Sequence, residues 1–373
     1  MEDKQYILGL DDYIRQEEPQ KQERGRAWQT AIGLQEVDGL KTSVYLMETA
    51  RKHIEGDITI GEAKQLIDNY YKSQTRRKEI VNERTEEADK VSARITELLQ
   101  EQTFNFSLAQ YTSIHRRLFE GIFKFAGRIR DYNITKQEWI LRGESVYYAS
   151  ADTIRETLDY DMGQERNYNY EGKSIDEAIS HLTRFCANLW QIHAFGEGNT
   201  RTTAVFMIKY LKTLGLKVTN DLFATNSWYF RNALVRANYS NLQEGITETT
   251  IYLERFFRYM LLGEAIPLRN REMHLDWKLE NDRATNDFQS KKVPVQGANS
   301  ALSLPPKCKN CTLEEVAVLR IIKQEPSATQ KSIASEIRKS ERTVKSITAR
   351  LQKLGILKRI NGKRNGYWEL INE

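Results

Sequence analysis

Cysteine and proline are scarce in this 373-residue chain, which has three cysteines and six prolines. An odd number of cysteines does not suit a disulfide framework. The single C-x-x-C, formed by Cys308 and Cys311, has no second pair that would complete a zinc ribbon. We therefore expect two ordinary linker thiols and a protein that folds around its apolar core.

Long apolar runs are also missing. The mean hydropathy is −0.63, and no run approaches the roughly 18 apolar residues that a membrane-spanning helix requires. The opening residues, MEDKQ, include two acidic residues and no apolar segment of the signal-peptide type. These absences predict a cytoplasmic protein with no membrane partner.

Charge of one sign is in excess only at the C-terminal end. The chain has 56 Lys and Arg against 51 Asp and Glu, a formal net charge of +5. Residues 310–373 contain 13 basic and 7 acidic residues, so they account for the positive excess. A nucleic-acid contact is therefore expected there.

Apolar residues recur three or four positions apart through most of the first 273 residues, which predicts a mainly α-helical fold. The best-marked helix begins with a capping box, Ser174 and Glu177, and continues with an apolar stripe made of Ile175, Ile179, Leu182, Phe185, Leu189 and Trp190. The segment NITKQEWILRGESVYYA interrupts this pattern and predicts a β-hairpin over residues 134–148. Residues 281–311 show no periodicity and are interpreted as a linker.

A glycine-containing loop, HAFGEGNTR at residues 193–201, follows the capped helix and precedes a second amphipathic helix. Gly196 and Gly198 permit a tight turn whose N–H groups, with the N-terminal end of the next helix, can face a phosphate. In this loop His193 offers a proton acceptor for a hydroxyl, and Glu197 offers a hard oxygen ligand for Mg²⁺. Asn199 adds a neutral hydrogen-bond donor, and Arg201 adds a planar cation.

The loop resembles the Fic family motif, H-x-F-x-[D/E]-G-N-G-R-x-x-R, and residues 104–273 resemble a Fic core. Six specified positions match: His193, Phe195, Glu197, Gly198, Asn199 and Arg201. The resemblance implies a nucleotidyltransferase that moves AMP from ATP to a Ser, Thr or Tyr hydroxyl of a target protein or of itself. It implies that His193 is the base and that Glu197 binds Mg²⁺. The implied nucleotide-binding residues of the loop are Gly196, Gly198, Asn199, Thr200 and Arg201.

Two positions depart from the motif, because Thr200 replaces its second glycine and Ala204 replaces its final arginine. In Fic proteins that arginine holds the terminal phosphates and pairs with an inhibitory glutamate. Residues 34–71 resemble an antitoxin-type inhibitory module whose motif is degenerate, with Asp38 at the glutamate position. We therefore expect Asp38 to have no arginine partner, so that the usual inhibitory ion pair is missing.

Two more segments complete the site in this interpretation. The predicted hairpin over 134–148 would be the flap that binds a target segment by strand addition, although a plain structural hairpin is equally compatible with its sequence. Tyr229 and Asn232 occupy the region where Fic proteins place residues beside the adenine, and a buried core helix is the alternative. The sequence leaves the oligomeric state open, with a homodimer as one option.

The last residues resemble a winged helix-turn-helix. They contain an amphipathic helix over 312–325, a short helix in TQKSIASEI, a longer helix capped by Ser340 and a strand–turn–strand ending. The candidate DNA-binding residues are Arg342, Thr343, Lys345, Ser346, Arg350, Lys363 and Arg364. Dimerisation or protein contact is the alternative use of this domain.

The predicted organisation is a helical N-terminal region (1–103, including 34–71), a Fic core (104–273), a linker (274–311) and a winged helix-turn-helix (312–373). The alternative function is a DNA-binding transcriptional regulator in which a catalytically weak Fic core senses a nucleotide.

Overall fold

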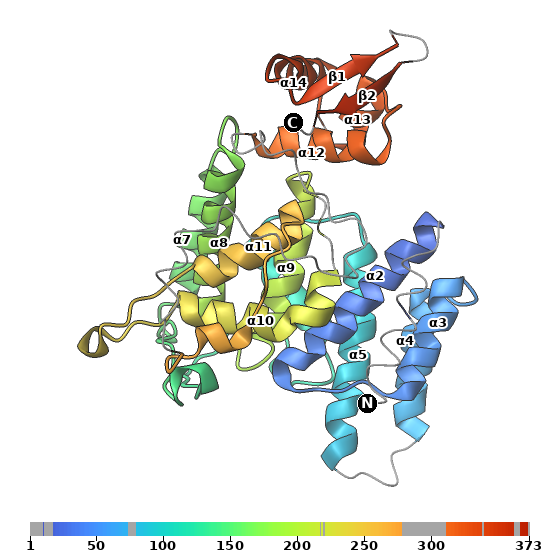
Figure 1. The fold of residues 1–373 in the computed structure, drawn as a ribbon. Helices are drawn as coiled ribbons and strands as arrows, with labels where there is room; N and C mark the ends of the chain where they lie inside the picture. The colour runs from blue at the N-terminus through green and yellow to red at the C-terminus, as the bar shows by residue number, and fades with distance from the viewer. Residues whose placement is uncertain are drawn as a thin grey trace.

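The computed structural model describes residue 10 and residues 18–73, 80–216, 218, 221–277, 311–337, 339–361 and 366–371. The described chain is mainly α-helical, as the sequence predicted, with one small antiparallel sheet near the C-terminus (Figure 1). Among the described helices, none has both the length and the apolar content of a membrane span.

The N-terminal region packs four helices and a 3₁₀ turn against the rest of the protein. These elements are α2 (Pro19–Gly33), η1 (Leu34–Asp38), α3 (Val44–Glu55), α4 (Ile60–Ser73) and α5 (Ile80–Gln100). Trp28 lies in a small apolar core of its own beneath α3 and α4. Helix α2 approaches the later helix α10 (Asp221–Ala237) so closely that a Cβ on Gly33 would lie 2.3 Å from the Cα of Ala224. This close approach brings η1 to the centre of the molecule.

The central body surrounds one helix, α9 (Asn199–Thr213), in which nearly every residue is buried. The other elements of this body are α6 (Leu108–Phe119), α7 (Ile154–Asn167), α8 (Ile175–Ile192), α10 and α11 (Ile251–Leu262), with short 3₁₀ turns η3 (Leu242–Glu244) and η4 (Asn270–Met273). Helix α9 packs mainly against α5, α6 and α8. The predicted capping box of α8 is confirmed, since the Ser174 and Glu177 side chains each accept from the other's backbone N–H. All residues of its predicted apolar stripe are buried.

The segment 134–148 does not form the β-hairpin that the sequence predicted. It doubles back, with the Glu138 N–H donating to the Glu144 carbonyl at 2.9 Å, but its residues are not strand, and the tip is a 3₁₀ turn, η2 (Trp139–Leu141). Ile140 and Leu141 are both completely buried. A strand points successive side chains to opposite faces, so burying two neighbours favours the turn.

The C-terminal domain consists of α12 (Leu313–Gln324), α13 (Gln330–Glu336), α14 (Glu341–Lys353), β1 (Leu357–Ile360) and β2 (Tyr367–Leu370). The strands are antiparallel, with Leu357 opposite Leu370. Each helix starts at a side-chain cap: Thr312, Thr329 and Ser340. Three helices followed by a two-stranded wing form the winged helix-turn-helix that the sequence predicted.

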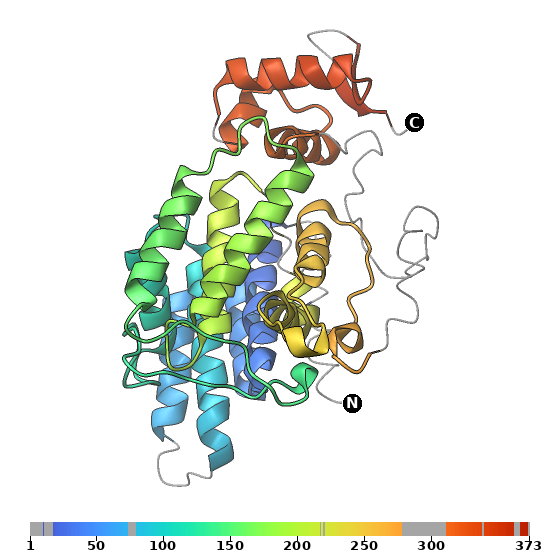
Figure 2. The same ribbon diagram turned by 90° about the vertical axis from the view of Figure 1, so that its left-hand side faces the viewer.

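This domain rests on the central body through α12, while α14 lies on its far side (Figures 1 and 2). The Ile175 N–H donates to the Cys311 carbonyl at 2.8 Å, and Ser174 and Thr312 form an isolated antiparallel bridge. Cys311 is disulfide-bonded, which corrects the expectation of a free thiol at this position.

Candidate active site

The glycine-containing loop connects the end of α8 to the start of α9 through two residues with left-handed backbone. His193 is the C-cap of α8 with φ 49°, and Gly198 is the N-cap of α9 with φ 76°. A Cβ on Gly198 would lie 2.4 Å from the Phe119 ring, so both conformation and space require glycine there. Among the residues that the structure describes, no side chain caps the N-terminus of α9.

The other loop glycine, Gly196, lies against two aromatic side chains. A Cβ on Gly196 would lie 2.5 Å from the Tyr132 hydroxyl and 3.3 Å from the Phe125 ring. These two aromatic side chains therefore cover the loop at this point.

The imidazole of His193 is buried, and neither ring nitrogen has a hydrogen-bond partner among the described residues. Burial lowers its pKa well below the usual 6.5, and the nearby charges of Lys136, Arg130 and Arg231 lower the pKa further. The ring packs against Tyr148, with ring centres 4.2 Å apart. His193 is thus a neutral imidazole that is able to accept a proton.

Arg130 fixes the backbone of this loop. Its buried guanidinium donates to the carbonyls of His193, Ile192, Ala149 and Tyr132. Because all four acceptors are backbone oxygens, Arg130 joins the loop to the start and end of the segment around residues 132–149.

Asn199 and Thr200 also hold the loop. The Asn199 side chain accepts from the Phe195 N–H at 2.9 Å and donates to the Phe195 carbonyl at 2.7 Å. The Thr200 hydroxyl accepts from the Trp190 indole N–H at 2.9 Å. Both side chains are buried, so the structure uses them to shape the loop.

His115 of α6 is a site residue that the sequence analysis missed. Its Nδ1 accepts from the Gly127 N–H at 2.8 Å, so Nε2 carries the hydrogen and donates to the Glu197 carbonyl at 3.0 Å. Burial lowers its pKa to about 4, which keeps the ring in this neutral form. The one available signal was its position on the apolar face of the helix, four residues after Tyr111.

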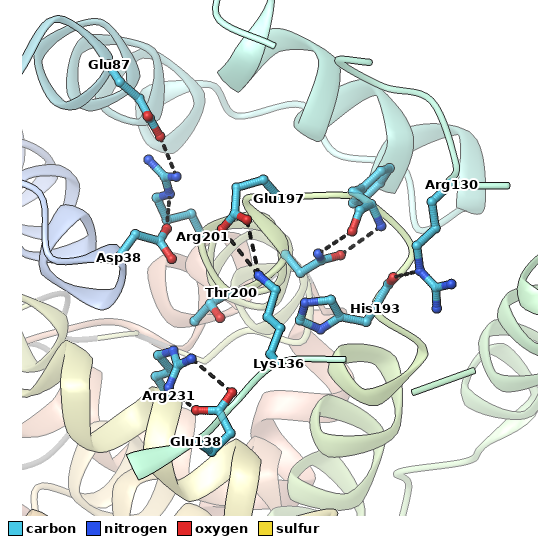
Figure 3. A network of polar contacts seen from close by, with 12 residues as sticks. Asp38, Glu87, Arg130, Lys136, Glu138, His193, Glu197, Thr200, Arg201 and Arg231 are labelled. Atoms are coloured by element: carbon cyan, nitrogen blue, oxygen red, sulfur yellow. Dashed lines mark hydrogen bonds and ion pairs between the residues drawn. The ribbon is translucent and has the colours of Figure 1, made fainter. Parts of the chain in front are cut away.

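The Glu197 carboxylate faces the ammonium of Lys136, which comes from the 134–148 segment (Figure 3). The Lys136 ammonium lies 3.3 and 3.2 Å from the two carboxylate oxygens. The side chains remain 28% and 40% exposed, respectively. Lys136 was also missed by the sequence analysis.

The Mg²⁺ expected from the sequence can be tested against these residues. Within the described ranges, no group of three or more His, Cys, Asp or Glu side chains could hold a metal ion. Mg²⁺ often binds one or two carboxylates, several waters and the phosphates of a substrate. Glu197 therefore fits a cation that arrives with a nucleotide, rather than a preformed protein cage.

Arg201 is completely buried and surrounded by acceptors from the N-terminal region (Figure 3). Its Nη2 donates to Glu87 of α5 at 2.7 Å, and its Nη1 donates to Gln35 of η1 at 3.0 Å. Its Nε lies 2.8 Å from Asp38 in an ion pair that lacks hydrogen-bond alignment. The expectation that Asp38 has no arginine partner is therefore wrong. The partner is Arg201, and position 204, completely buried as alanine, takes no part.

The two candidate adenine-binding residues lie in the core on α10. Tyr229 is buried beside Phe256, and buried Asn232 donates to the Asn270 side chain at 2.8 Å. This placement agrees with the alternative that these residues belong to a buried core helix. Contact with adenine stays a prediction.

Most of the candidate DNA-binding side chains of α14 are exposed, namely Arg342, Lys345, Ser346 and Arg350. Thr343 is partly buried and bonded to the Ser340 hydroxyl. Lys345 pairs with Glu341 at 2.9 Å, and Arg350 pairs with Glu315 at 3.1 Å. Lys363 and Arg364 lie outside the described residues.

Comparison with known proteins agrees with this geometry, since residues 105–211 match the Fic/DOC family. The chain carries a Fic domain. Residues 315–358 match a winged helix-turn-helix DNA-binding family. The Fic domain thus contains α6 to α9 and the loop with His193. The Fic and winged helix-turn-helix resemblances drawn from the sequence are confirmed, and the resemblance of residues 34–71 to an antitoxin-type module stays a prediction.

Individual relatives of the Fic domain are distant. A protein adenylyltransferase of Bartonella henselae is 27% identical over 142 residues, which cover 36% of this chain and 26% of that protein. The chain thus spans about a quarter of that relative's length. The crystal structure of the N-terminal Fic domain of Bep8 from Bartonella sp. 1-1C is 19% identical, with a TM-score of 0.40 over 50% of this chain and 88% of that one. A Fic family protein from Desulfovibrio desulfuricans G20 is 12% identical, with a TM-score of 0.41 over 100% of this chain and 95% of that one.

Proposed function

We propose that this protein transfers AMP from ATP to a hydroxyl group of a target protein or of itself. The observation that carries the proposal is His193, a buried neutral imidazole beside the N-terminus of α9. Within the described part of the chain, neither the imidazole nor that helix N-terminus has a side-chain hydrogen-bond partner. A helix N-terminus favours phosphate, and a neutral imidazole next to it can take the proton of an attacking hydroxyl.

In the proposed reaction the hydroxyl oxygen forms a bond to the α phosphorus, and the bond from that phosphorus to the pyrophosphate oxygen breaks. His193 accepts the hydroxyl proton, and pyrophosphate leaves with the bonding electrons. Gly196, Gly198 and the first N–H groups of α9 face the phosphates, and Arg201 adds a cation when its carboxylate partners release it. Glu197 would hold Mg²⁺, which neutralises charge on the α and β phosphates when bound.

We further propose that the target segment binds along residues 134–148. This segment doubles back around η2, and Tyr147 is 84% exposed. Backbone near the base can pair with a target strand with little dependence on side chains.

ATP labelled at the α or the γ phosphate tests the transfer. We expect self-labelling from the α position and none from the γ position, because only the nucleotidyl group is transferred. Labelling from the γ position alone would instead indicate phosphoryl transfer. Nucleotide binding without either label would favour the second candidate function, a DNA-binding regulator whose Fic domain senses nucleotide. The ion pairs on Arg201 favour that candidate, since they occupy a cation of the site.

The winged helix-turn-helix is proposed to bind DNA through α14. Replacing exposed Arg342 by alanine should weaken binding and lower the slope of log affinity against log salt by about one, the effect of losing one phosphate contact. Fluorescence anisotropy with a duplex of mixed sequence measures both quantities.

The control for this test is Arg269→Ala, which removes an arginine with 55% exposure from outside the winged helix-turn-helix. An equal loss of salt dependence in both variants would show that general charge, and not α14, determines DNA binding.

A further inference from the structure

The cations around the loop differ in how firmly they are held. Arg130 donates to four backbone carbonyls. Arg231 of α10 forms a two-pronged ion pair with Glu138, whose side chain is 1% exposed. Arg201 is fully buried between Glu87 and Asp38. Breaking any of these interactions would leave a buried charged group without a partner, which costs free energy.

Lys136 is held differently. Within the described ranges its ammonium pairs with a single carboxylate, that of Glu197, and both side chains are partly exposed to solvent. Ion pairs in such surroundings contribute little to stability, and an ammonium on a flexible four-carbon chain can change partners. Of the four cations compared, Lys136 is therefore the one that can bind a phosphate with the smallest loss of existing interactions.

Contacts of the neighbouring backbone and side chains fix where the Lys136 side chain begins, while its ammonium group can still change position. Lys136 and Glu138 lie two positions apart in this segment, and Figure 3 shows both side chains directed toward the site. Glu138 is anchored to Arg231, and the Lys136 N–H donates to the Ser145 hydroxyl at 3.2 Å. Figure 3 shows the ammonium between Glu197 and the His193 ring. That is the position that the phosphates in the proposed reaction would occupy.

Positions 200 and 204 of α9 add no positive charge to the site. Position 204 is a buried alanine, and Thr200 contributes a hydroxyl that already accepts from Trp190. A cation reaching the loop from the 134–148 segment can supply charge that these two positions do not.

We propose that Lys136 is a phosphate-binding residue of the nucleotide site, which exchanges its contact with Glu197 for the phosphates of the bound nucleotide. This inference rests on the proposed function for the identity of the ligand. Charge-assisted bonds to a polyphosphate are stronger than the exposed pair they replace. The exchange also leaves the Glu197 carboxylate available to a divalent cation.

Calorimetric titration of the full chain with a non-hydrolysable ATP analogue and Mg²⁺ tests the inference. Lys136→Met should weaken binding at least tenfold, and Lys136→Arg should stay within threefold of the wild type because the charge is kept. The matched control is Lys124→Met, which removes an exposed lysine of the same Fic domain and should change binding by less than twofold. Thermal unfolding of all variants checks that the fold is kept, as expected for an exposed pair.

A second titration with inorganic triphosphate separates the inference from the proposed function. Wild-type-like binding of both probes to Lys136→Met overturns the inference and leaves the proposed function standing. Triphosphate binding that depends on Lys136, without binding of the ATP analogue, supports the inference and contradicts the proposed nucleotide. Absence of binding of either probe to the wild type overturns both.

Discussion

The His193→Asn variant is expected to transfer AMP at least a hundredfold more slowly than the wild type, with nucleotide affinity changed by less than threefold. A general base acts in the chemical step and contributes about 10²- to 10⁴-fold, but adds little to binding of the ground state. Asparagine is chosen because His193 has φ 49°, a conformation that asparagine adopts more readily than alanine. Self-labelling rates and calorimetric titration measure the two quantities.

The control is His181→Gln, which removes a histidine from the same helix, where it contacts Glu165 and not the loop. It should leave transfer within threefold of the wild type. A parallel loss of affinity and rate in His193→Asn would contradict the base assignment.

The pH profile gives an independent check of the same residue. The base must be unprotonated to act. Because the pKa of His193 lies well below 6.5, the usual pKa of a histidine, His193 stays unprotonated at pH 6.5. The transfer rate should therefore stay level as the pH falls from 8 to 6.5. A twofold or greater fall near pH 6.5 would indicate a histidine of ordinary pKa.

The double variant Asp38→Asn with Glu87→Gln is expected to transfer AMP at least tenfold faster than the wild type. Both substitutions remove the negative charge that holds Arg201 but keep a side chain of the same shape. The released guanidinium can then stabilise charge on the phosphates. Asp38→Asn alone should change the rate by less than threefold, because Glu87 and Gln35 still bind Arg201. Self-labelling rates measure each step of the series.

Glu86→Gln is the matched control, since Glu86 is the neighbouring carboxylate on α5 and pairs with Lys90. It should leave the rate unchanged. Adding Arg201→Met to the double variant should abolish the gain. If the double variant folds, as judged by thermal unfolding, and shows no gain, then Arg201 joins the N-terminal region to the Fic domain and does not bind phosphate.

Local patterns in the sequence predicted the elements that carry the site. The capping box at Ser174 and the apolar stripe after it fixed α8, and the glycines after His193 marked the loop and the start of α9. These signals work because caps and helical periodicity depend on residues a few positions apart.

The contacts of Arg201 could not be predicted in the same way. Glu87 lies 114 positions away in the sequence and Gln35 lies 166 away, so no local pattern relates them. The sequence did single out Asp38 but assigned it the wrong arginine position. Packing of α2 and η1 against α10 decides which arginine the carboxylate meets.

The segment 134–148 was mispredicted for a related reason. Its Ile, Trp, Val and Tyr residues favour strand locally. Burial of the adjacent Ile140 and Leu141 in the main core outweighs that preference.

The hydrogen bond between Thr200 and Trp190 bears on how this loop tolerates substitution. Position 200 lies within α9, where ordinary helical backbone accepts any L side chain, whereas position 198 has left-handed backbone against Phe119. Threonine therefore occupies the motif's second glycine position without backbone strain, and it satisfies an indole N–H that glycine would leave unpaired. The backbone at position 200 thus tolerates a side chain, whereas the backbone at position 198 and the Phe119 ring beside it require glycine.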